Sequence, residues 1–154
     1  MRIISAALIA AFISYPLFAL ETWKPSGIDP AVDYYKIGRN AAKSGDFSTA
    51  AKMLRFAYFS RNDANTFFWY CDALNRGGFA DELIAEYEAA PEAVRYGKDY
   101  GAHPARMTAE TLRRSGNTSK AADILVEAYR KNTKDRNAVG SMLVFQNMLD
   151  TGLS

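Results

Sequence analysis

The chain has 154 residues, of which 49% are hydrophobic, and a formal net charge of +2. This length and composition indicate one globular domain with enough apolar residues for a core, and they exclude a disordered tail, a collagen and a coiled coil. The near balance of charge gives no argument for nucleic-acid binding, while one cysteine and one histidine exclude a disulfide framework, a thiolate metal cluster and a histidine-rich metal site.

The N-terminus has the layout of a secretory signal peptide. Arg2 is followed by the apolar run IISAALIAAFISYPLFAL, residues 3–20, and the next charge is Glu21. Ala19 supplies the small residue that a signal peptidase needs, so we expect residues 1–19 to be removed. The same run is near the lower limit for a membrane span, so an uncleaved anchor at residues 3–20 is the alternative. We expect a periplasmic or secreted protein, or in the alternative one anchored in the inner membrane.

The sequence predicts a leader at residues 20–30 and a folded domain at residues 31–154. The leader is rich in turn formers, and Asp29 and Pro30 can supply an N-cap and a first-turn proline to the first helix. Beyond it, long stretches are rich in Ala, Leu, Lys, Arg and Glu and lack alternating β-branched runs. This pattern predicts an all-α domain.

Local turn signals divide the domain into about seven helices. Glycine and proline end a helix, whereas aspartate and asparagine cap the next one. These signals lie, in chain order, at Gly45-Asp46, Asn62-Asp63, Gly77-Gly78, Pro91, His103-Pro104, Ser115-Gly116-Asn117, Asn132–Asp135 and Thr151-Gly152. The short connections predict antiparallel helical hairpins.

A motif recurs across these hairpins. In the first hairpin, an aromatic, an apolar and a small residue precede a Gly-Asp-aromatic turn, and two alanines flank a leucine after it: Tyr34, Ile37, Gly38, Gly45, Asp46, Phe47, Ala50, Leu54 and Ala57. Weaker copies surround the turn glycines Gly78 and Gly116. The pattern resembles the tetratricopeptide repeat, a helix-turn-helix unit of about 34 residues. An unrelated bundle of hairpins and the related Sel1-type repeat are the alternatives.

The resemblance implies a right-handed α-solenoid of about three repeats with a terminal capping helix. Small residues such as Gly38 and Ala109 would lie where paired helices cross closely. The second interval between turn glycines is longer than the first, so we expect an inserted turn or short helix between Pro91 and Pro104. The stretch from Asn137 to Leu149 would then cover the last hairpin.

In tetratricopeptide proteins, the first helices of the hairpins line a concave groove that holds a partner segment. The residues that the resemblance places in this groove are Tyr35, Arg39, Phe68, Asp72, Asn75, Arg76, Arg106, Glu110 and Arg113. Aromatic and arginine side chains are frequent interface anchors. The arginines suit an acidic or extended segment of the partner. Self-association through the concave face or the terminal helix is a further hypothesis.

The sequence offers little for catalysis. His103 precedes Pro104 at a predicted helix start, where a turn role is natural, and Cys71 occupies a small position that predicts a buried structural thiol. The fourth predicted helix has an acidic face, which consists of Asp81, Glu82, Glu86 and Glu88. Such a face is usually exposed to solvent. A small helical hydrolase that uses this acidic face and His103 is the least favoured alternative.

These observations predict an exported protein–protein interaction module rather than an enzyme. Its role would be that of a scaffold or assembly factor, and its partner another envelope or secreted protein. We expect no catalytic residue, metal, cofactor or nucleic-acid partner.

Overall fold

The computed structural model describes residues 27–98, 100, 102–134, 144–148, 150 and 152. Every regular element within these ranges is helical, which confirms the predicted all-α class. The helices are α1 (Tyr34–Ser44), α2 (Phe47–Arg61), α3 (Ala64–Gly77), α4 (Ala80–Ala89), α5 (Glu92–Arg95), α6 (Ala102–Arg114) and α7 (Thr118–Lys134). Residues 144–148 are also helical.

The predicted signal peptide at residues 1–19 and the alternative anchor at residues 3–20 lie outside the described residues, as do residues 20–26 of the leader. Among the helices that the structure does describe, none combines the length and the apolar character that a bilayer crossing requires.

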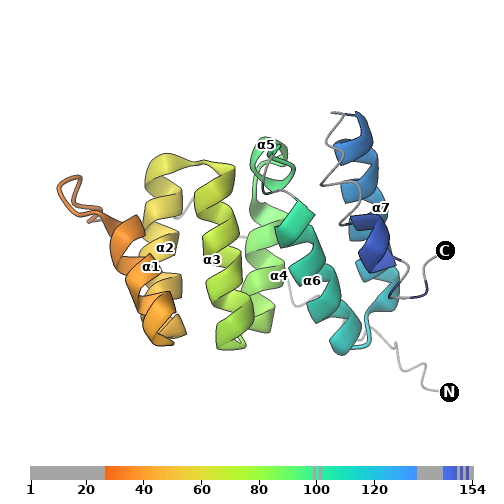
Figure 1. Ribbon diagram of the computed structural model, residues 1–154, viewed down its shortest axis with the longest axis horizontal. Coiled ribbons are helices and arrows are strands. Elements are labelled where there is room, and N and C mark those ends of the chain that lie inside the picture. Colours follow the sequence, from red (N-terminus) through yellow and green to blue (C-terminus); the bar gives the residue numbers. More distant parts are fainter. Residues whose placement is uncertain are drawn as a thin grey trace, which may run out of the picture.

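The helices stand side by side in a row, with α1 at one end and α7 at the other (Figure 1). Sequential neighbours pack together, most extensively α1 with α2, α2 with α3, and α6 with α7. The central helix α3 packs against α1, α2, α4, α5 and α6. The core therefore runs along the whole row of helices.

Predicted caps begin or end several of the helices. Side-chain oxygens of Asp46, Asp63 and Asn117 accept hydrogen bonds from the backbone N–H three residues later, at 3.0, 2.9 and 3.3 Å. Such caps satisfy donors that the first turn of a helix leaves without a partner. Gly45 and Gly78 end α1 and α3 with φ of 84° and 77°, in the left-handed region that favours glycine.

The start of the first helix differs from the prediction. Asp29 Oδ1 accepts a hydrogen bond from the Ala31 N–H at 2.8 Å, so this carboxylate closes a local turn instead of capping a helix. The cap is Asp33, whose Oδ1 accepts from the Lys36 N–H at 3.1 Å. Asp29 and Asp33 both have a side chain suited to an N-cap. The turn that follows Asp29 occupies its carboxylate, so the helix begins after Asp33.

The end of α7 also differs from the prediction, whereas a short helix is found where one was expected. Asn132 was expected to separate two helices, but it is buried inside α7, and its Nδ2 donates to the Ala128 carbonyl at 2.7 Å. This bond satisfies the amide without breaking the helix, which continues to Lys134. Between Pro91 and Pro104, α5 is the short helix that the longer interval predicts.

Close packing explains the small residues of the motif. A Cβ atom on Gly38 would lie 2.7 Å from Leu54 Cγ and 3.2 Å from the Ala50 carbonyl oxygen, so α1 and α2 cross at a distance that only glycine permits. In α3, the thiol of Cys71 is fully buried, as predicted, and burial raises its pKa well above the usual value.

The described part of the predicted terminal stretch packs on the preceding helices. Val144 is fully buried and Met148 packs against the core. The Phe145 ring lies 6.2 Å from the Tyr129 ring of α7, measured between centroids. This short helix reaches the surface formed by α6, and there it borders the pocket described next.

Candidate functional site

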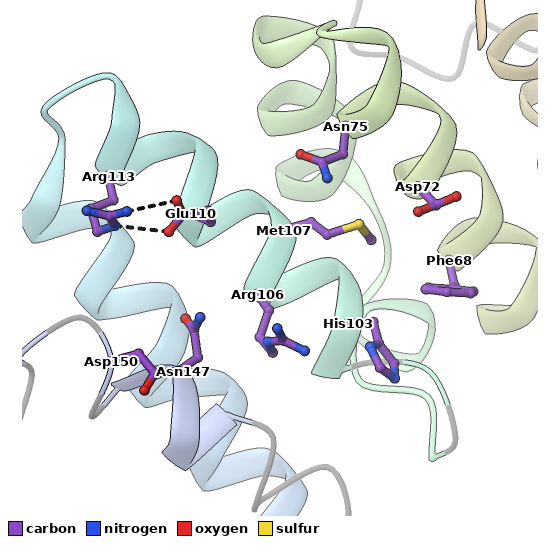
Figure 2. Close-up of a pocket in the computed structure, with 10 residues that line it drawn as sticks. All are labelled: Phe68, Asp72, Asn75, His103, Arg106, Met107, Glu110, Arg113, Asn147 and Asp150. Atoms are coloured by element: carbon purple, nitrogen blue, oxygen red, sulfur yellow. Dashed lines mark hydrogen bonds and ion pairs between the residues drawn. The ribbon is translucent and has the colours of Figure 1, made fainter. Parts of the chain in front are cut away.

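An open pocket of about 600 Å³ lies between α3, α6 and the C-terminal helical stretch. Figure 2 shows side chains from all three elements around it. Its lining consists of Phe68, Asp72 and Asn75 of α3, His103, Arg106, Met107, Glu110 and Arg113 of α6, and Asn147 and Asp150. A pocket of this size can hold one or two side chains of a bound segment.

Six of the nine predicted groove residues line this pocket. They are Phe68, Asp72, Asn75, Arg106, Glu110 and Arg113. Within each helix the members are three or four positions apart, so they form one stripe along α3 and one along α6. The packing of α3 against α6 brings the two stripes together.

The other three predicted groove residues do not line the pocket: Tyr35, Arg39 and Arg76. The Tyr35 hydroxyl accepts a hydrogen bond of 3.4 Å from Asn65. The Arg39 guanidinium lies over the Trp69 ring, with its Cζ atom 3.0 Å from the ring centroid. Tyr35 and Arg39 therefore contact α3 instead of the pocket, whereas Arg76 pairs with a residue of its own helix.

Most of the charges at the pocket are paired within the protein. Asp72 lies 3.6 Å from Arg76, one helical turn away. Glu110 accepts two hydrogen bonds from Arg113, at 2.9 and 2.8 Å, and these bonds lower the pKa of the Glu110 carboxyl. Arg106 differs: among the described residues it has no hydrogen-bond or ion-pair partner, although its Nε atom is buried.

Aromatic rings form one wall of the pocket. The Phe68 ring lies 5.4 Å from the Tyr100 ring, 5.3 Å from His103 and 4.7 Å from Trp69, measured between centroids. Burial, and then the positive charge of Arg106, lower the pKa of His103. The imidazole is therefore predominantly uncharged at neutral pH, and this end of the pocket is an apolar surface beside a cation.

Sequence reasoning missed four lining residues: His103, Met107, Asn147 and Asp150. His103 was assigned a turn role, but it lies in the first turn of α6 and faces the pocket. The spacing from His103 to Arg106, Met107 and Glu110 places all of them on one helix face and would have identified it. No such signal links the C-terminal residues to α3.

The acidic face of α4 takes part in other contacts. Glu86 forms an ion pair of 2.7 Å with Arg55 of α2, and Glu88 pairs with Lys120 of α7. None of the four carboxylates of this face lines the pocket with His103. Within the described part of the chain, no three histidine, cysteine, aspartate or glutamate residues are grouped as metal ligands would be.

Comparison with known proteins does not identify a family for this chain. No protein-family model, curated protein or solved structure matches the chain. A function must therefore be argued from the pocket and the sequence.

Proposed function

We propose that the chain is an exported, non-enzymatic interaction module that binds a segment of another envelope or secreted protein. The observation that carries this proposal is the meeting of six predicted groove residues around one pocket, although they come from two helices far apart in the sequence. Its lining mixes aromatic, charged and amide side chains, as the anchoring part of a protein interface does.

The architecture in this proposal is a right-handed α-solenoid of three tetratricopeptide-like repeats. The repeats are α1 with α2, α3 with α4, and α6 with α7, with α5 inserted before the last and a C-terminal capping helix. Support comes from the glycine turns, from the close crossing at Gly38 and from the packing of each hairpin on the next.

The proposed location of the protein is the periplasm or the cell exterior, after removal of residues 1–19. Its support is the charged start and apolar run of the sequence. Mass spectrometry of the protein isolated from its host tests this part. A mature N-terminus at Leu20 is expected, whereas a chain that begins at Met1 in the membrane fraction would favour the anchored alternative at residues 3–20.

Site-specific photo-crosslinking tests the binding function. A photoreactive phenylalanine analogue at Phe68 should form a discrete product with another envelope protein, whereas the same analogue at Tyr129, an exposed position on α7, should not. Arg106→Glu should abolish the product, and the matched change Arg130→Glu on α7 should preserve it. No product at Phe68, or equal products at both positions, would refute the proposal, and a dimer of the chain would indicate self-association.

A further inference from the structure

The four arginines predicted to line the groove differ in what they contact. Arg39 lies over an aromatic ring, Arg76 pairs with Asp72, and Arg113 makes two hydrogen bonds to Glu110. Neither Arg39 nor Arg106 has a hydrogen-bond acceptor in the described part of the chain, but of these two only Arg106 lines the pocket. Of the two guanidinium groups in the pocket lining, that of Arg106 therefore remains available to a ligand.

The position of Arg106 favours a carboxylate as that ligand. Its side chain lines the pocket, is partly exposed and has no acceptor among the described residues, so its guanidinium gains hydrogen bonds when an acceptor arrives. A guanidinium offers parallel N–H donors that match the two oxygens of a carboxylate. An anion at this point therefore gains hydrogen bonds that the protein does not already make.

The rest of the lining limits how much negative charge the pocket accepts. Asp72, Glu110 and Asp150 contribute three carboxylates, against the two guanidinium groups of Arg106 and Arg113. A second acidic group on the ligand would therefore meet like charge without an available cation. The pocket suits one carboxylate and disfavours a polyacidic segment.

Apolar surface adjoins the cation. Figure 2 shows the Met107 side chain extending from α6 toward α3, where the Phe68 ring faces the same space, with His103 between Phe68 and Arg106. These side chains are partly exposed at the pocket and would be covered by an apolar group of the ligand.

We propose that Arg106 holds a single carboxylate of the bound segment, and that Phe68 and Met107 receive a large apolar side chain next to it. This inference rests on the proposed binding function and specifies the chemistry of the partner. The carboxylate belongs either to an aspartate or glutamate side chain or to a chain terminus, because the guanidinium recognises the same group in both.

Selection from two displayed peptide libraries tests the inference, one with an internal random segment and one with a free random C-terminus. The purified protein should enrich peptides that have one carboxylate beside a large apolar residue. Synthetic copies should bind Arg106→Gln at least about tenfold more weakly, Arg106→Lys with an intermediate loss, and the control Arg130→Gln unchanged.

Changes in the peptide keep the test valid if Arg106→Gln does not fold. Replacing the acidic side chain by its amide, or amidating the C-terminus, should weaken binding to the unchanged protein by about tenfold or more. Whichever change has this effect identifies the source of the carboxylate. On a folded Arg106→Gln protein, the same peptide change should have little further effect.

The outcomes separate this inference from the proposal beneath it. Enriched peptides that bind Arg106→Gln as tightly as the unchanged protein, or that are polyacidic, would overturn the carboxylate inference and leave the binding function intact. A selection that enriches no peptide in either library would overturn both.

Discussion

Replacing Gly38 by alanine tests how closely α1 and α2 cross. The new Cβ atom would lie 2.7 Å from Leu54 Cγ, 3.1 Å from the Leu54 backbone nitrogen and 3.2 Å from the Ala50 carbonyl oxygen. Two of these atoms belong to the backbone, and Leu54 is fully buried, so none can move aside freely. One helix must shift away from the other to accept the methyl group.

Two opposing effects set the magnitude. Alanine is favoured over glycine inside a helix by about 0.5–1 kcal/mol. Overpacking a tight site costs about 1–3 kcal/mol, and three close contacts place Gly38→Ala in the upper half of this range. We therefore expect a net loss of about 1–2.5 kcal/mol in the free energy of unfolding.

Urea titration followed by circular dichroism measures this loss as a lower midpoint at an unchanged slope. Asn40→Ala, on the exposed side of the same helix, is the matched control and should be neutral or slightly stabilising. In a Leu54→Ala background, where Cγ is missing, Gly38→Ala should cost about 1 kcal/mol less than in the unchanged protein. A Gly38→Ala protein more stable than the parent by about 0.5 kcal/mol would refute the close crossing, because helix propensity alone would then explain the result.

Three further predictions concern titration, capping and burial. The pKa of His103 is lowered in the folded protein, so the unfolded chain, in which a histidine has a pKa near 6.5, binds the proton first as the pH decreases, and stability should fall below about pH 6.5. His103→Gln should reduce this loss of stability, measured by urea titrations at about pH 7.5 and 5.5. An unchanged pH dependence in this variant would contradict the prediction. Asp63→Ala removes two hydrogen bonds to Thr66, of 2.9 and 2.7 Å, and should cost about 1–2 kcal/mol in the same assay, whereas Asp63→Asn should cost less. The thiol of Cys71 should react with Ellman's reagent only in denaturant, because burial disfavours the thiolate; rapid reaction of the native protein would contradict the packing.

Much of the helix order could be predicted because its signals are local. Gly45 and Asp46, or Gly78, determine a turn through their own backbone preferences and side-chain caps, whatever packs around them. The buried small residues Gly38 and Cys71 were predictable for a related reason. Two helices that cross closely leave space for only small side chains, and this requirement recurs with the motif.

Some errors arose between competing local signals, and others where distant residues decide the outcome. Asn132 is a common turn residue, but it is buried inside α7 and its amide bonds to the preceding helical turn. Arg39 and Arg106 look equivalent in the sequence, yet one stacks on Trp69 and the other faces the pocket without an acceptor among the described residues. No local pattern distinguishes them, because the distinction depends on which aromatic or acidic side chain lies on the adjacent helix.

Helix α3 connects the pocket to the hairpin of α1 and α2, which contributes no residue to the pocket lining. One face of α3 carries Phe68 into the pocket, while Phe67 and Tyr70 on other faces are buried in the core that α1 and α2 share. A ligand that restrains α3 against α6 therefore also opposes local opening of α1 and α2. Amide hydrogen exchange in this hairpin should slow when the pocket is occupied, so its protection reports binding at a distance.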